Sequence, residues 1–91
     1  MTRKRVILSG EVQGVFFRDT CRRLALEHGV GGWVRNRPDG TVEAVFEGPP
    51  GNVDHMVAWA RRGPRGARVE HIEVYDESPV GLADFTIRRS P

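Results

Sequence analysis

Cysteine is nearly absent from the chain, whose single thiol belongs to Cys21. One thiol forms no internal disulfide, and it does not complete a zinc site with the three histidines scattered along the sequence. We therefore expect no disulfide-stapled secreted fold and no zinc site, and we expect the protein to lie in the reducing cytoplasm. Cys21 falls on an apolar helical stripe and is predicted to be a small buried hydrophobe.

Long hydrophobic runs are missing as well. The longest apolar stretches are far shorter than the roughly 18 residues that a membrane-spanning helix needs. Residues 1–5 are basic like the start of a secretion signal, but the apolar run from Val6 to Leu8 behind them ends at Ser9. The sequence predicts a soluble protein without a membrane partner.

A large excess of charge of one sign is the third feature that the chain lacks. Its 14 lysines and arginines are nearly balanced by 12 aspartates and glutamates, which leaves a formal net charge of +2. This small excess gives weak grounds for a nucleic-acid partner. At 91 residues the chain has room for one core, so we expect residues 1–91 to form a single domain with one site.

Hydrophobic alternation and helical spacing divide the chain into strands and helices. We predict helices at Phe17–His28 and from a cap at Asn52 to Gly63, and a tight turn at residues 38–40. Residues 48–51, Gly-Pro-Pro-Gly, are predicted to exclude regular structure. The predicted strands are Arg5–Val12, Val30–Arg37, Thr41–Glu47, Arg68–Tyr75 and Phe85–Arg89.

This order, β-α-β-β-α-β with a short terminal strand, predicts an α+β fold, the ferredoxin-like two-layer sandwich. In that architecture an antiparallel sheet with strand order 4-1-3-2 carries both helices on one face. The first two strands run in the same direction, two positions apart in the sheet. The segment after the first strand therefore faces the end of the second strand across roughly 10 Å.

The segment after the first strand, residues 10–18, is a glycine-containing loop that leads directly into a helix. Gly14 allows a turn in which backbone N–H groups point into one concavity, and the helix N-terminus adds partial positive charge. Arg18, in the first helical turn, offers a planar charged group that matches two phosphoryl oxygens. The loop is therefore predicted to bind phosphate, while the side chains of Phe16 and Phe17 are predicted to anchor the loop or the core.

The second predicted strand ends near Asn36, which the topology places opposite that loop. Its carboxamide both donates and accepts hydrogen bonds, so it can orient a water molecule without carrying a charge. Taken alone, an arginine in a first helical turn is most often a solvated surface residue, and an asparagine near a turn most often caps it. Their convergence on one sheet edge favours a functional role for both.

These two segments resemble the two signatures of the acylphosphatase family. The first, Gly-x-Val-Gln-Gly-Val-x-Phe-Arg, is matched at every specified position by residues 10–18. The second is matched by residues 32–36, Gly-Trp-Val-Arg-Asn, and by Gly40, Val42 and Gly48 behind them. Two matched motifs at the right separation are a specific signal, and the resemblance covers nearly the whole chain.

The resemblance implies hydrolysis of the carboxyl-phosphate bond of a small acyl phosphate, with inorganic phosphate as product and inhibitor. It implies that Arg18 binds and stabilises the phosphoryl group and that Asn36 positions the attacking water. No general acid is needed for this chemistry, because a carboxylate leaves without being protonated. No metal or other cofactor is needed either, because an arginine and several backbone amides can support the equatorial phosphoryl oxygens. We expect a monomer. The phosphate cradle would consist of the backbone amides of Gln13, Gly14, Val15, Phe16 and Phe17.

Two alternatives use the same fold. A single-stranded RNA-binding module would stack bases on aromatic side chains of the open sheet face, but the sequence places Glu43 and Glu47 there and no aromatic residue on the first strand. A non-catalytic phosphate-binding or regulatory domain would keep the cradle without catalysis. The presence of both Arg18 and Asn36 favours the enzyme, with no nucleic-acid partner.

Overall fold

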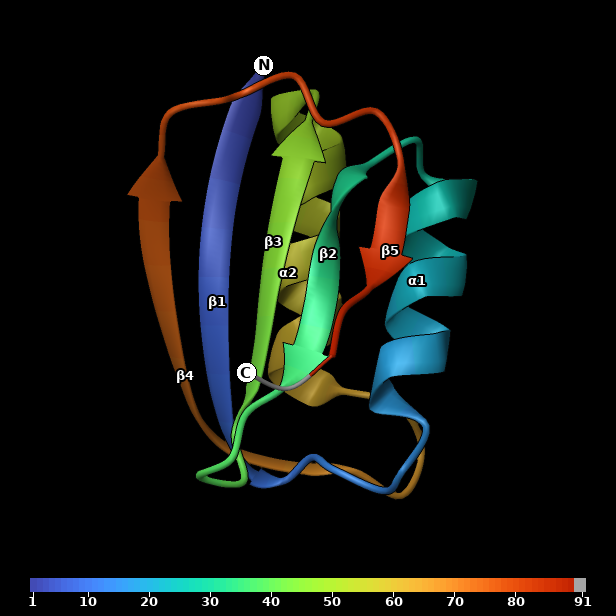
Figure 1. Cartoon of the computed structure of the whole chain (residues 1–91), viewed down its shortest axis with the longest axis vertical. Coiled ribbons are helices and arrows are strands. Elements are labelled where there is room, and N and C mark those ends of the chain that lie inside the picture. Colours follow the sequence, from blue (N-terminus) through green and yellow to red (C-terminus); the bar gives the residue numbers. More distant parts are fainter. Residues whose placement is uncertain (90–91) are drawn as a thin grey trace.

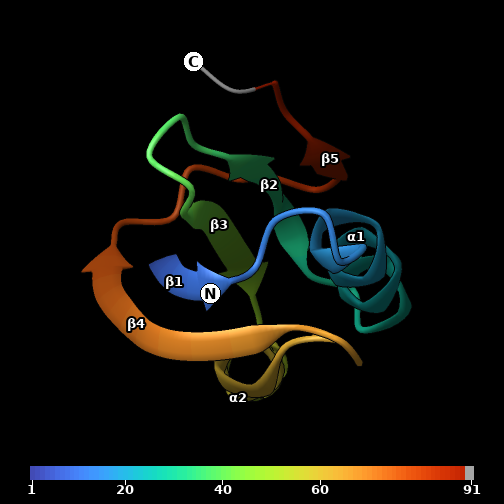
Figure 2. The ribbon, with the colours of Figure 1, turned by 90° about the horizontal axis from the view of Figure 1, so that it is seen from below.

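The computed structural model describes residues 1–89, which form an open sheet with two helices packed on it (Figure 1). The sheet order is β4-β1-β3-β2-β5, and both helices cover one face (Figure 2). The predicted ferredoxin-like α+β fold and its 4-1-3-2 order are therefore confirmed. The strands are β1 (Thr2–Glu11), β2 (Gly31–Asn36), β3 (Val42–Gly48), β4 (Arg68–Glu77) and β5 (Phe85–Ile87), and the helices are α1 (Phe17–Glu27) and α2 (Pro50–Arg62).

Strand β5 makes the sheet mixed rather than antiparallel throughout. It pairs with β2 in parallel, with Gly32 opposite Phe85 and Val34 opposite Ile87, whereas the other pairs are antiparallel. The predicted antiparallel order 4-1-3-2 holds for the first four strands, whereas the sequence pattern assigned no direction to the short terminal strand. Strand β4 ends at the same end of the sheet at which β2 begins, and the segment from β4 to β5 crosses along that end (Figure 1). Strand β5 therefore starts beside the start of β2 and runs in the same direction.

Helix α2 begins earlier than the sequence pattern indicates, so the predicted break at residues 48–51 is wrong. Its first residue is Pro50, which follows the N-cap residue Pro49. Proline is tolerated there because its ring already holds a helical φ and its missing N–H would have had no partner in the first turn. Asn52 is therefore not the cap. Its side-chain amide donates a 3.0 Å hydrogen bond to the C=O of His28 and ties α2 to the end of α1.

The ends of other elements also depend on pairing. Strand β1 begins earlier and β4 ends later than predicted, because the two strands pair along nearly their whole lengths, starting with Arg3 opposite Glu77. Strand β5 is shorter than predicted and ends at Ile87. Such ends are set by the neighbouring strand, which local sequence patterns do not identify.

The core lies between the sheet and the helices. Helix α1 contributes Phe17, Cys21 and Ala25, which follow one helical stripe. Phe17 is 2% exposed, and its ring packs on Trp59 of α2 with 5.0 Å between centroids, so its predicted role as an anchor is confirmed. Cys21 is fully buried, as predicted, and burial raises the pKa of its thiol.

The open face of the sheet carries ion pairs. Glu43 contacts Arg5 at 3.2 Å and Arg35 at 2.7 Å. Glu77 accepts hydrogen bonds of 2.9 Å from both Arg3 and Arg5. The predicted carboxylates are therefore present on this face, and they are engaged with arginines across the strands.

Glu47 of β3 holds the connection between β4 and β5 in place. Its side chain is fully buried, and its carboxylate accepts hydrogen bonds from the backbone N–H groups of Val80, Gly81 and Leu82 at 2.9, 2.7 and 2.6 Å. Burial opposes the charged form, but the three amides and the Arg3 guanidinium together lower the pKa of this carboxyl. The charged carboxylate thus positions the segment that leads into β5.

We expect Glu47→Gln to lower the free energy of unfolding by about 1–3 kcal/mol, because a neutral amide replaces the acceptor of charge-assisted hydrogen bonds. A carboxyl whose pKa folding lowers stabilises the protein above its unfolded pKa of about 4.3 and loses that contribution as the pH falls through its folded pKa. Urea denaturation should therefore show the difference between the wild type and the variant shrinking below about pH 4.

Glu70→Gln is the matched control, because Glu70 lies on β4 with an exposed side chain and only a 3.9 Å contact to Arg68. Exposed pairs of this kind contribute about 0–1 kcal/mol. An equal loss of stability in both variants, or a difference that grows at low pH, would contradict the role given to Glu47.

Candidate active site

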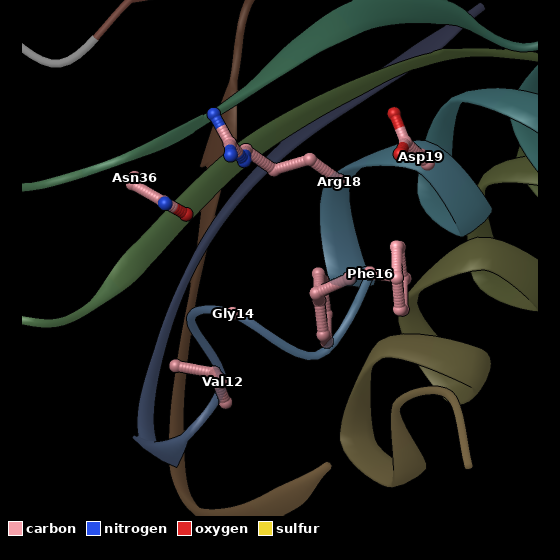
Figure 3. Close-up of a pocket in the computed structure, with 7 residues that line it drawn as sticks. Val12, Gly14, Phe16, Arg18, Asp19 and Asn36 are labelled. Carbon is pink, nitrogen blue, oxygen red and sulfur yellow. The ribbon is translucent and has the colours of Figure 1, made fainter. Parts of the chain in front are cut away.

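A cavity of about 220 Å³ opens between the β1–α1 loop and the end of β2. The Arg18 side chain extends from the first turn of α1 toward Asn36, whose carboxamide points into the same space (Figure 3). The structure thus brings together the two side chains that the sequence singles out. The lining residues are Val12, Gly14, Phe16, Phe17, Arg18, Asp19 and Asn36.

Asn36 is held by the end of a strand. It is the last residue of β2 and pairs with Val42 of β3. Because side chains alternate along a strand, Asn36 shares the helix-facing side of the sheet with the buried Val34. The hairpin behind it is closed by a 2.8 Å hydrogen bond from the N–H of Arg37 to the C=O of Thr41. The backbone that carries the carboxamide is therefore well fixed.

Gln13 ties the loop to this hairpin. Its side-chain amide donates hydrogen bonds of 2.9 Å to the C=O groups of both Arg37 and Thr41. The glutamine thereby sets the spacing between the loop and the strand end, although it does not itself line the cavity. Val15 also lies outside the lining and packs against the core. Of the predicted cradle residues, those that line the cavity are Gly14, Phe16 and Phe17.

The loop backbone turns through two left-handed residues, Gly14 with φ 73° and Phe16 with φ 59°. A Cβ atom added to Gly14 would meet nothing within 4 Å, so the glycine is required by conformation rather than by space. In a residue with a side chain, this left-handed backbone conformation would be less favourable by about 1–2 kcal/mol. Left-handed residues in a tight turn are typical of backbone nests, in which successive N–H groups converge on an anion.

The start of α1 adds further donors to the cavity. The N-cap residue is Phe16, whose C=O accepts a 3.1 Å hydrogen bond from the N–H of Thr20. The N–H groups of Phe17, Arg18 and Asp19 precede the first intrahelical bond and have no partner within the helix. Together with the helix dipole they favour an anion at this end. Arg18 adds a full positive charge to the same place.

Two lining residues, Val12 and Asp19, are not predicted from the sequence, and the side chain of Phe16 lies differently from the prediction. Val12, the residue that follows β1 in the chain, is buried and lines the cavity with apolar surface. Asp19 adds a carboxylate next to Arg18 in the chain. Its position in the first helical turn, at the end of the helix that lines the cavity, could have identified it from the sequence. The side chain of Phe16 is 78% exposed, so the prediction that it anchors the loop or the core is wrong. As a left-handed N-cap it precedes the buried stripe, which begins at Phe17.

The remaining ionisable groups lie elsewhere. His28 and His55 do not line the cavity and instead contact each other, with ring centroids 4.3 Å apart. In the stretch from Met1 to Arg89, no group of three or more His, Cys, Asp or Glu side chains is placed to hold a metal ion. Within the same stretch, no helix has the length and apolar character required to cross a membrane.

Comparisons with known proteins agree with this arrangement. The family model described as acylphosphatase matches residues 4–87. An acylphosphatase of Rubrobacter xylanophilus is 60% identical over 87 residues, which cover 94% of this chain and 79% of that protein. An acylphosphatase of Gloeobacter violaceus is 52% identical over 88 residues, which cover 97% and 95% of the two chains.

The fold has a counterpart among solved structures. The crystal structure of acylphosphatase from Bacillus subtilis matches with a TM-score of 0.92 at 36% identity, over 97% of this chain and 99% of that one. The agreement thus includes both motif segments, the sheet and both helices. Because it extends over nearly the whole chain in sequence and in structure, the resemblance noted from the two motifs is confirmed, and the chain belongs to the acylphosphatase family.

Proposed function

We propose that this protein hydrolyses the carboxyl-phosphate bond of small acyl phosphates in the cavity that Arg18 and Asn36 share. The observation that carries the proposal is the meeting of a cationic side chain, a neutral carboxamide and the donors of a helix N-terminus in one cavity of about 220 Å³. Sites for drug-sized ligands are usually larger, about 300–1,000 Å³. The size of this cavity therefore favours a small substrate.

The phosphoryl group is bound by charge and by backbone donors. The guanidinium of Arg18 donates two parallel hydrogen bonds to phosphoryl oxygens, and the loop amides from Gln13 to Phe17 surround the remaining oxygen. These donors are held in place before substrate arrives, because Gln13 fixes the loop to the β2–β3 hairpin and Phe17 anchors it to the core. Donors held in this way stabilise the charge of the transition state without reorganising.

Asn36 places the attacking water. Its carboxamide forms a hydrogen bond with the water and holds the oxygen in line with the bond that breaks. The water oxygen bonds to phosphorus while the phosphorus–oxygen bond to the acyl group breaks, and that electron pair leaves on the carboxylate. One water proton passes to a phosphate oxygen or to the solvent, so the products are a carboxylate and inorganic phosphate.

The leaving group explains why few residues suffice. A carboxylic acid has a pKa of about 4 to 5, so its anion departs at neutral pH without a general acid. A loose phosphoryl-transfer transition state needs mainly alignment of the water and support for the equatorial oxygens. The Arg18 side chain and the amides supply that support, so the proposed mechanism uses no metal ion.

We also assign the protein a cytoplasmic location, a monomeric state and a single domain spanning residues 1–91. Two observations support the location and the single domain. The lone thiol, Cys21, is buried and free, which suits a reducing compartment. The sheet and both helices share one hydrophobic core.

The RNA-binding alternative is disfavoured because arginines cover the aromatic rings on the open sheet face of residues 1–89. The ring of Trp33 is contacted by the guanidinium groups of Arg35 and Arg88, at 5.2 and 4.6 Å from its centroid. The Tyr75 ring is contacted by Arg5 at 4.7 Å. Bases that stack on such modules need free aromatic faces.

The purified protein is expected to hydrolyse benzoyl phosphate and acetyl phosphate with undiminished turnover in EDTA, because neither Arg18 nor the loop amides depend on a metal. Inorganic phosphate should inhibit competitively, because it occupies the same cradle. The measurement is the initial rate of each substrate with and without chelator and with increasing phosphate. Phosphate binding without any hydrolysis would support the non-catalytic alternative, and loss of activity in EDTA would contradict the proposed mechanism.

A further inference from the structure

We propose that the side chain of Phe16 is the contact surface for the acyl group of the substrate, so that the enzyme prefers uncharged, apolar and above all aromatic acyl phosphates. This inference rests on the proposed function and adds a substrate class to it. The phenylalanine ring of Phe16 is 78% exposed and lines the catalytic cavity. Exposure of this kind adds little to the stability of the fold.

The backbone of Phe16 is also unusual. Its φ of 59° makes it the one left-handed residue other than glycine in the described chain from Met1 to Arg89. A bulky residue in this region is a conformational outlier, and such outliers concentrate at ligand sites, where the surrounding structure maintains them. Here the neighbouring contacts are the hydrogen bond from Thr20 to the Phe16 C=O and the burial of Phe17 against Trp59. The loop thus keeps an aromatic ring outside the core, beside the cavity.

The geometry of the in-line attack places the leaving acyl group near this ring. In-line attack requires the water and the leaving oxygen to lie on opposite sides of phosphorus. Asn36, which places the water, lies on one side of the cavity, and Phe16 lies on the other (Figure 3). The acyl group therefore leaves toward the side that Phe16 lines.

The charge of the lining restricts the acyl group further. Asp19 is the one carboxylate among the described lining residues. An acyl group with its own negative charge would be repelled by it, and like-charge repulsion of this kind excludes wrong partners. An uncharged apolar acyl group meets no such opposition and gains contact with the Phe16 ring.

The test compares kcat/KM for benzoyl phosphate with kcat/KM for acetyl phosphate in the same enzyme. The ratio of the two cancels any effect of a substitution on the phosphate cradle that both substrates use. Phe16→Asn should lower this ratio by about threefold to tenfold, which corresponds to the loss of one aromatic contact. Asparagine is chosen because it tolerates the left-handed backbone. Phe16→Tyr keeps the ring and should keep the ratio.

Leu26→Asn is the matched control, because Leu26 is an exposed apolar residue of α1 that does not line the cavity. It should leave the ratio unchanged. An unchanged ratio in Phe16→Asn, or an equal fall in Leu26→Asn, would overturn the role of Phe16 while leaving acyl phosphate hydrolysis intact. A wild-type protein that hydrolyses neither substrate would overturn the proposed function, and the inference with it.

Discussion

Arg18→Ala is expected to lower kcat/KM for benzoyl phosphate by about 10²- to 10⁴-fold. Each hydrogen bond from a charged group contributes about 1.5–3 kcal/mol, and the guanidinium supplies two of them to the phosphoryl oxygens. The same bonds hold inorganic phosphate, so its inhibition constant should rise steeply as well. Steady-state kinetics with phosphate as inhibitor measures both effects.

Arg22→Ala is the control for this substitution. Arg22 lies one turn further along α1, is exposed and does not line the cavity, so its removal changes the charge of the helix but not the site. Arg18→Lys should recover only part of the activity, because an ammonium group keeps the charge without the planar fork. A loss of less than about threefold in Arg18→Ala would be too small for two charged hydrogen bonds and would contradict the assignment.

Asn36→Ala is expected to lower kcat by about 10²-fold or more while the inhibition constant of phosphate stays within about threefold. The reason is that Asn36 acts on the water rather than on the phosphoryl group. Removing an interaction that forms only in the transition state lowers turnover without weakening ground-state binding. Single-turnover rates with benzoyl phosphate, together with phosphate inhibition, measure the two effects separately.

Asn36→Gln tests whether the position of the carboxamide matters as well as its presence, because the substitution keeps this group and moves it by one methylene group. It should remain close to Asn36→Ala in turnover, since misplacement by about 1 Å can cost 10²-fold. A thermal melt of each variant checks that the end of β2 still folds. If Asn36→Ala weakened phosphate binding as much as Arg18→Ala does, the two residues would share one role and the proposed division between them would be wrong.

The candidate site was largely accessible from the sequence. A glycine loop that enters a helix, with an arginine in the first turn, is a local pattern whose phosphate chemistry follows from backbone donors and one charge. The facing position of Asn36 required only the order of the strands. The exposed ring of Phe16 was not accessible, because its left-handed backbone depends on the loop between Gly14 and the anchored Phe17.

The sequence by itself determined the order of strands and helices, the hairpin and the chemical groups of the site, because periodicity, turn residues and motif spacing act over a few neighbouring residues. Only the tertiary structure decided the parallel pairing of β5, the buried carboxylate of Glu47 and the bond from Gln13 to the hairpin. Each of these joins segments far apart in the chain. Their energies come from contacts that exist only once the sheet is assembled, so no local pattern records them.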